Sequence, residues 1–268
     1  MNMKNNGPRK RLLALDTSTA VLGVAITEQG ELIREINATG ERNHSVHLLP
    51  IIQEALRASE TAPDRLEGIA VGIGPGSYTG TRIAVTAAKT LAWAWNVPVI
   101  GISSLHALAW GGYQAASAER DSARPETEWI VPLIDARRGQ AYTAVYAAER
   151  SAPPRRLAAD GIRLMADWVL ELKQRIAEAE TEGQKPGIIR FVGETSLHGR
   201  NEVLEPLFLE TEVAVAPYEL EGRWVGLLGA SGIYRAADDA HDLIPNYTQL
   251  SEAEANLRRS REGSLNQP

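Results

Sequence analysis

Short apolar runs alternate with longer amphipathic ones along this chain, and this alternation predicts an α/β protein. Apolar runs of roughly four to eight residues bounded by turn residues are typical of buried strands, and longer runs with apolar positions three or four apart are typical of helices. The predicted strands cover residues 11–16, 20–27, 31–37, 68–74, 98–101, 129–135, 140–147 and 188–192. The predicted helices cover residues 45–59, 81–95, 103–116, 165–181 and 219–235. Because the first three strands follow one another directly, we expect them to form an antiparallel meander.

The beginning of the chain is echoed in its second half. A strand, Asp16, a turn and a strand open the chain, and a strand, Asp135, a tight turn and a strand follow from residue 129. Two such hairpins predict a two-lobed, actin-like or ribonuclease H-like duplication, with mixed central sheets flanked by helices. The polar stretch 114–128 is the best boundary. The predicted division is a first lobe at 9–116, a smaller second lobe at 117–218, a helix and strand packing back between the lobes at 219–250, and a polar tail at 251–268.

Two predicted helices of the first lobe carry more apolar surface than one sheet requires. In helix 45–59 the apolar positions wrap more than one face, so we expect it to contact two surfaces. In helix 81–95 a row of small residues at Ala84, Ala88 and Ala92 runs beside a larger apolar stripe. Such a row fits close packing against the sheet or close contact with a partner helix, and the pattern leaves both open.

Composition narrows the possible functions. The 268 residues are 44% hydrophobic, which is enough for a normal core, and the formal net charge is −6 with scattered Lys and Arg. Any work on RNA would therefore leave most phosphate contacts to a partner. The absence of cysteine excludes disulfides, a thiol nucleophile and a cysteine-ligated metal. The same absence fits a cytoplasmic protein. The most apolar segment, residues 83–99, contains Lys89 and Asn96, so we expect a buried helix and strand there and no membrane segment.

The Gly-rich segment 72–80 is the most informative stretch for chemistry. A strand, a Gly-rich turn and a helix start together make an anion-binding geometry. The segment lacks the Gly-Lys-Ser/Thr ending of a P-loop, the GxGxxG spacing and the GxSxG nucleophile pattern. Upstream, Asp16 with Thr17 and Ser18 fits either a site for a metal-bound phosphate or a turn whose side chains bond local amides.

The histidines predict no metal site. His44 and His47 could share a helical face, but no acidic ligand lies at a supporting spacing. His106 has Trp110 four residues on, where an HxxxH pair would need a second imidazole. We therefore interpret His106 as a surface or interface residue.

Five segments spread over most of the chain form one combined pattern. They are Leu15-Asp16-Thr17-Ser18-Thr19; His44-Ser45 with Leu48-Leu49-Pro50; the run from Gly74 to Ile83 with Ala88-Lys89; Gly101-Ile102-Ser103-Ser104-Leu105; and Pro245-Asn246-Tyr247 with residues 252–254. Together they resemble the bacterial TsaB/YeaZ family over about residues 10–255. The Gly-rich stretch and its following helix are the most specific part of the resemblance.

The resemblance implies an ASKHA-type actin-like fold and a place in the complex that makes N6-threonylcarbamoyladenosine at position 37 of tRNAs reading ANN codons. In that complex the paralogue TsaD carries an HxxxH metal site and transfers the threonylcarbamoyl group, and the ATPase TsaE joins the pair. For this chain the resemblance implies a scaffold that binds TsaD as a heterodimer. It implies no catalytic residue, no cofactor and no metal, contact with tRNA only through the complex, and a homodimer when the chain is isolated.

The resemblance also assigns two groups of residues. The predicted partner surface comprises Leu48, Leu49, Ile52, Leu56, Ala84, Ala88 and Ala92. The predicted vestigial nucleotide cleft comprises Asp16, Thr17, Ser18, Gly74, Gly76, Ser77, Gly80, Asp135 and Gly193. We interpret the cleft as degraded because Arg137 and Arg138 stand where nucleotide-binding paralogues favour Gly and Thr. Two alternatives stay open, a small-molecule kinase of the same superfamily and a zinc peptidase.

Overall fold

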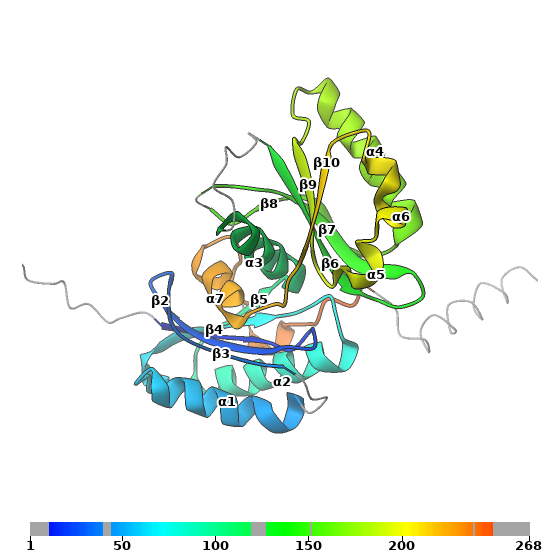
Figure 1. Cartoon of the computed structure of the whole chain (residues 1–268). Helices are drawn as coiled ribbons and strands as arrows, with labels where there is room; N and C mark the ends of the chain where they lie inside the picture. The colour runs from blue at the N-terminus through cyan, green and yellow to red at the C-terminus, as the bar shows by residue number, and fades with distance from the viewer. Residues whose placement is uncertain (1–10, 40–43, 119–126, 151, 238, 249–268) are drawn as a thin grey trace, which may run out of the picture.

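Two five-stranded mixed sheets form the two lobes of the chain (Figure 1). This computed structural model describes residues 11–39, 44–118, 127–150, 152–237 and 239–248. The first sheet contains β1 (Arg11–Asp16), β2 (Leu22–Glu28), β3 (Glu31–Ala38), β4 (Leu66–Gly72) and β5 (Val99–Ile102). The second contains β6 (Glu128–Asp135), β7 (Gln140–Ala147), β8 (Arg155–Leu164), β9 (Ile188–Gly193) and β10 (Glu212–Pro217).

Both sheets have the same topology. The first runs β3-β2-β1-β4-β5 and the second, read in the same direction, runs β8-β7-β6-β9-β10. In each sheet the first three strands pair antiparallel, and the two later strands join parallel. Equal order and equal strand direction confirm the predicted α/β duplication with mixed sheets.

The helices form an outer layer on each lobe and one shared layer between the lobes. The helices are α1 (His44–Ala58), α2 (Tyr78–Trp95), α3 (Ser104–Ala118), α4 (Met165–Thr181), α5 (Thr195–His198), α6 (Asn201–Leu204) and α7 (Gly222–Ala230), with 3-10 turns at Pro63–Arg65, Glu205–Leu207 and Ala240–Asp242. In Figure 1, α1 and α2 cover the outer face of the first sheet, whereas α3 and α7 lie between the two sheets. The helix α3 follows the first sheet but packs on β6 and β9, and α7 follows the second sheet but packs on β1 and β2. Each lobe thus supplies its last helix to the other sheet, which ties the lobes together.

The close approach of α2 to the first sheet follows from its sequence. Ala84, Ala88 and Ala92 are spaced by one helical turn and are fully buried, so the helix backbone can lie near the sheet. Ser77 caps the start of the helix, where its hydroxyl accepts the Gly80 N–H, and Asn96 in the left-handed conformation caps its end. Such an N-cap stabilises a helix by about 1 kcal/mol.

The structure differs from the predicted elements at the sheet edges and at the end of the chain. Strands β8 and β10, the two edge strands of the second sheet, were not predicted. Polar residues interrupt the apolar pattern of β8, whereas β10 is a short run of six residues whose side chains are all partly or fully exposed. The helix predicted at 219–235 is the shorter α7, and the chain leaves it at Ser231 and Gly232. Helix α3 continues to Ala118, into the stretch predicted as a linker from residue 114.

The segment after α7 returns to the first lobe. Ala237 N–H donates to the Val99 carbonyl at 2.9 Å, and Lys89 of α2 donates to the carbonyls of His241 and Leu243. In the described residues this segment contains one isolated bridge, between Ile100 and Ala236, where a strand was predicted. The division into domains stays a prediction, and the polar tail at 251–268 lies outside the described residues. No helix in the described part of the chain is both long and apolar enough to cross a membrane.

Candidate functional site

The bend after β1, here called the Asp16 turn (residues 16–19), is closed to solvent. Asp16 is 1% exposed, and its Oδ1 accepts the backbone N–H and the hydroxyl of Ser18 at 2.6 and 2.7 Å. Its Oδ2 accepts the hydroxyl of Ser104, at the start of α3, at 2.6 Å. Burial raises the pKa of Asp16, although the bonds from Ser104 and Ser18 oppose this shift. Both oxygens of the carboxyl group are therefore hydrogen-bonded within the protein.

The Gly-rich loop after β4 wraps around this turn. A Cβ on Gly72 would overlap the Asp16 carboxylate, and one on Gly80 would overlap the Thr17 carbonyl, so both positions require glycine for close approach. The Ser77 N–H donates to the Ser18 carbonyl at 2.7 Å, and the Thr17 hydroxyl donates to the Gly80 carbonyl at 2.6 Å.

The structure thus brings together seven of the predicted cleft residues. They are Asp16, Thr17, Ser18, Gly74, Gly76, Ser77 and Gly80. Within this group the Gly74 N–H donates to the hydroxyl of Ser104 at 3.1 Å. Some of the backbone N–H groups of the loop, which the sequence analysis considered for anion binding, therefore donate hydrogen bonds to oxygens of the protein itself.

The equivalent bend in the second lobe, here called the Asp135 turn (residues 135–140), is more open. The Asp135 side chain is 30% exposed, and its Oδ1 accepts the Arg137 N–H at 3.1 Å and the Nε2–H of buried His198 at 2.9 Å. The Asp135 N–H donates to Oε2 of Glu194 at 2.8 Å, and burial raises the pKa of Glu194. Gly193, at φ 101°, precedes Glu194, and its backbone lies against the Leu133 carbonyl.

Sequence reasoning missed His198 and Glu194 because they lie about sixty residues from Asp135 in the chain. Only the pairing of β9 with β6 brings them beside the turn. A signal existed in the short spacing from Gly193 to His198, but nothing in it indicates which carboxylate the histidine contacts.

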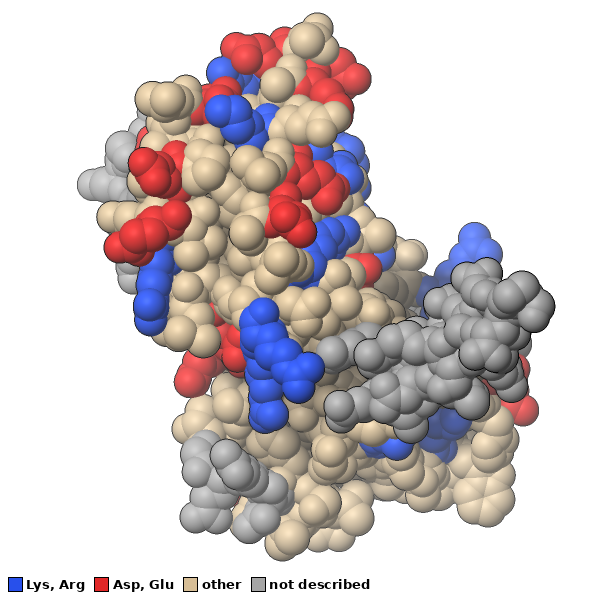
Figure 2. Space-filling view, turned by 90° about the vertical axis from the view of Figure 1, so that its right-hand side faces the viewer, with Lys and Arg blue, Asp and Glu red and all other residues tan. Residues whose placement is uncertain are grey.

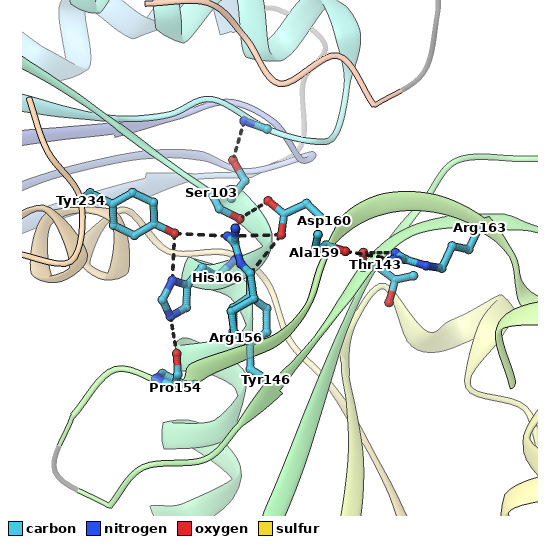
Figure 3. Close-up of polar contacts among 12 residues, drawn as sticks. Ser103, His106, Thr143, Tyr146, Pro154, Arg156, Ala159, Asp160, Arg163 and Tyr234 are labelled. Atoms are coloured by element: carbon cyan, nitrogen blue, oxygen red, sulfur yellow. Dashed lines mark hydrogen bonds and ion pairs between the residues drawn. The ribbon is translucent and has the colours of Figure 1, made fainter. Parts of the chain in front are cut away.

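A buried polar cluster joins the two lobes (Figure 3). His106 of α3 is 3% exposed, so its interpretation as a surface or interface residue is wrong. Its Nε2 lies 2.7 Å from the Pro154 carbonyl, which only accepts, so Nε2 carries the hydrogen and Nδ1 accepts the hydroxyl of Tyr234 at 2.9 Å. The ring also stacks on Tyr146 of β7, with 4.6 Å between ring centroids. Segments far apart in sequence bury this imidazole, which is why its spacing in the helix was uninformative.

The same cluster continues to Asp160 of β8. Its two oxygens accept the hydroxyls of Ser103 and Tyr146 at 2.7 and 3.1 Å, and Arg156 lies 3.4 Å away. Ser103 belongs to the α3 N-terminus, and Asp160 belongs to the second sheet. The cluster therefore bridges the lobes through paired, satisfied polar groups.

None of the shifted groups in this cluster titrates near neutral pH. Burial lowers the pKa of His106 to about 4, and the charge of Arg156 adds to this effect. Burial raises the pKa of Tyr234 to about 12 and that of Tyr146 well above its usual value. A general acid or base works best with a pKa near the working pH, so the cluster has the properties of a structural clamp.

An apolar groove of about 580 Å³ lies on the outer side of α1 and α2. It is lined by Ser45, Leu48, Leu49, Tyr78, Thr79, Arg82, Ile83, Thr86, Ala87, Thr90 and Leu91. At one end Tyr78 packs against Tyr247, with 5.6 Å between ring centroids, and Arg82 donates to the Tyr247 hydroxyl at 2.9 Å. This α1–α2 groove is a hollow apolar surface formed by two helices that also cover the core.

The burial of the two helices corrects most of the predicted partner residues. Leu48, Ile52, Leu56, Ala84, Ala88 and Ala92 belong to the core beneath the first sheet, and each is at most 9% exposed, although Leu48 also lines the floor of the groove. Leu49, which is 51% exposed, is the member of the predicted set that presents its side chain to solvent. The small-residue row thus takes the sheet-packing alternative, and the neighbouring stripe of Ile83, Ala87 and Leu91 lines the groove instead.

Comparison with known proteins identifies the family. The family model described as TsaD, tRNA N6-adenosine threonylcarbamoyltransferase, matches residues 32–185. The tRNA threonylcarbamoyladenosine biosynthesis protein TsaB of Bacillus subtilis is 35% identical over 250 residues, which cover 91% of this chain and 96% of that protein. This chain belongs to the TsaB family. TsaB of Escherichia coli is 36% identical over 139 residues, about half of each chain.

Solved structures agree with the fold of this TsaB-family chain. YeaZ from Pseudomonas aeruginosa covers 90% of this chain with a TM-score of 0.65 at 21% identity. A second Pseudomonas aeruginosa structure, described as similar to peptidase YEAZ, gives a TM-score of 0.66 at 24% identity. The predicted TsaB/YeaZ resemblance is confirmed.

Proposed function

We propose that this chain is a non-catalytic scaffold subunit that pairs with a TsaD protein in forming N6-threonylcarbamoyladenosine at position 37 of ANN-decoding tRNAs. TsaE joins the pair, and the complex works in the cytoplasm. The α1–α2 groove is the main structural support for the pairing. Membership of the TsaB family, whose named relatives are tRNA threonylcarbamoyladenosine biosynthesis proteins, supports the choice of reaction.

The groove has the properties of a helix-docking surface. Apolar side chains from both helices line it, and Leu49 and Tyr78 on its walls are about half exposed. Exposed apolar surface of this kind on a folded lobe marks an interaction site. Knobs from a second helix pair could fill the space between Leu49 and the Ile83 stripe.

The family match supports a TsaD protein as the partner that covers the groove. The matched residues, 32–185, include all of α1 and α2, so a TsaD protein and this chain are related across the helices that form the groove. Related surfaces can pair across a pseudo-two-fold axis, as identical surfaces do in symmetric dimers. The same argument supports a homodimer of the isolated chain through the same face.

The closed Asp16 turn supports a non-catalytic role. A working phosphate site needs a carboxylate and backbone N–H groups that face a ligand, whereas here Asp16 is bonded to Ser18 and Ser104. The His106 imidazole is neutral and engaged on both nitrogens. No group of three or more His, Asp or Glu side chains in the described ranges is arranged to hold a metal.

Two matched variants on α1 test the groove. Leu49 and Val46 are both exposed apolar residues of the same helix, but only Leu49 lines the groove. We expect Leu49→Asp to weaken binding to the TsaD protein at least tenfold, because a charge would be buried in an apolar contact. Val46→Asp serves as the control and should bind like the wild type in analytical ultracentrifugation. Equal binding by both variants would contradict the proposed surface.

A further inference from the structure

The Asp135 turn holds two adjacent arginines in a backbone conformation that arginine rarely adopts. Arg137 and Arg138 have φ values of 66° and 54°, and Gly139 follows at 74°. In this left-handed region a side chain approaches the following carbonyl, so residues other than glycine cost free energy there. A chain that keeps two arginines in such a turn gives up stability at this point, and strained turns of this kind cluster at functional sites.

The turn is fixed from several directions. Asp135 accepts the Arg137 N–H and is itself held by His198, and the Gln140 N–H donates to the Arg137 carbonyl at 2.9 Å. From the start of α4, the Met165 N–H donates to the Gly139 carbonyl at 3.0 Å. The backbone beneath both arginines is therefore held in place.

Both arginine side chains are exposed and available. Among the residues that the structure describes, neither guanidinium has an ion-pair partner or a side-chain hydrogen bond. Asp135 and Glu194, the carboxylates built into the turn, already accept from the turn backbone and His198. In Figure 1 the turn lies at the right-hand side of the second lobe, and the corresponding face in Figure 2 has Lys and Arg side chains at the waist between the lobes.

From this geometry we infer that Arg137 and Arg138 bind the phosphate backbone of the tRNA directly when the chain is in its complex. The inference rests on the proposed function, which brings tRNA to the complex. A guanidinium is planar and binds phosphate oxygens through two parallel N–H groups. Two of them on a rigid, protruding turn fit a backbone that offers a phosphate at every nucleotide. Such contacts position an RNA without reading its sequence.

The test measures the affinity of the assembled complex for an unmodified tRNA transcript over a range of salt concentrations. Arg137→Gln/Arg138→Gln should raise the Kd about tenfold and lower the slope of log Kd against log salt by about 1 to 2, because two phosphate contacts are lost. Arg137→Lys/Arg138→Lys keeps both charges, so the salt dependence should stay close to that of the wild type, while part of the affinity is lost because an ammonium group cannot donate two parallel N–H bonds. Arg57→Gln/Arg65→Gln removes two exposed cations from the opposite end of the first lobe and should match the wild type.

A single glycine variant separates binding from folding. Arg138→Gly removes one cation and also relieves the left-handed strain, so the Tm should not fall while the Kd rises several-fold. A structural role for Arg138 would instead lower the Tm together with the affinity.

Three outcomes would overturn the inference. In the first, the double Gln variant binds tRNA as tightly as the wild type at every salt concentration. In the second, the Arg57/Arg65 control loses as much affinity as the double Gln variant. In the third, the double Gln variant keeps its tRNA affinity but no longer binds an acidic protein partner. Failure of the proposed function would give a different experimental result. In that case the wild-type chain would fail to stimulate threonylcarbamoyl transfer, whatever the variants do.

Discussion

The Asp16 turn and the Asp135 turn occupy equivalent places in the two lobes, yet one is sealed and the other is open. Asp16 is 1% exposed beneath the Gly-rich loop, whereas the Asp135 side chain is 30% exposed and is followed by two exposed arginines. The strands around both turns have the same order and direction. Duplication has therefore preserved the sheets, and the differences lie in the loops and helices attached to them.

The helices that connect the last two strands of each sheet also differ between the lobes. Between β4 and β5 the first lobe has α2, a helix of 18 residues that forms one wall of the α1–α2 groove. Between β9 and β10 the second lobe has two helices of four residues each, α5 and α6. In α5, His198 supports the Asp135 turn. The first lobe thus offers an apolar groove and the second a turn with two exposed arginines, which is consistent with the proposed contacts to a protein partner and to an RNA.

The largest expected effect concerns one glycine that packs against the Asp16 turn and one glycine within the Asp135 turn. Gly72→Ala would place a methyl group on the Asp16 carboxylate, and we expect a loss of about 3 to 5 kcal/mol in the free energy of unfolding. Gly139→Ala in the Asp135 turn meets only Leu164, at 3.5 Å, and should cost about 1 kcal/mol from its positive φ. Denaturant unfolding measures both losses. Similar losses would show that the Asp16 turn is not more tightly packed than its counterpart.

A smaller effect is expected where the lobes meet. The pKa of His106 is lowered to about 4 from 6.5, so between these values the unfolded chain binds more protons than the folded one. Stability should therefore be complete above pH 6.5 and decrease as the pH falls towards 4, by on the order of 3 kcal/mol for this group. The raised pKa of Asp16 acts in the opposite direction, because its protonation favours the folded state.

Comparison with His106→Gln isolates the histidine contribution. Glutamine can still donate to the Pro154 carbonyl but does not titrate. The free energy of unfolding of the variant should decrease less than that of the wild type over the same pH range. Parallel pH profiles of the wild type and the variant would mean that burial does not lower the pKa of His106.

The sequence predicted the repeated parts of this molecule better than its surfaces. The two hairpins with aspartate at the bend indicated the duplication, because strand patterns and turn residues are local signals. Strand β8 escaped prediction because polar residues interrupt its apolar pattern, and β10 is a six-residue run without a buried side chain. Their place in the sheet depends on β7 and β9 rather than on their own composition.

The direction in which a helix faces could not be predicted from its pattern. In α2 the row of Ala84 and Ala88 and the stripe of Ile83 and Ala87 are adjacent on the helix, and both are apolar. Which one meets the sheet depends on how close the backbone must come, and that is set by β4 and α1. The same limit applies to His106, whose partners Pro154 and Tyr234 lie far away in the chain.

We propose that this chain is required for threonylcarbamoyl transfer but does not perform it. The most direct measurement is threonylcarbamoyl transfer to an ANN-decoding tRNA by the TsaD protein, alone, with this chain, and by this chain alone, with the other components constant. If the chain is a scaffold, transfer should occur only when both proteins are present, and it should be lost with Leu49→Asp but not with Val46→Asp. Transfer by this chain alone, or no stimulation when it is added, would show that the chain is not a required scaffold.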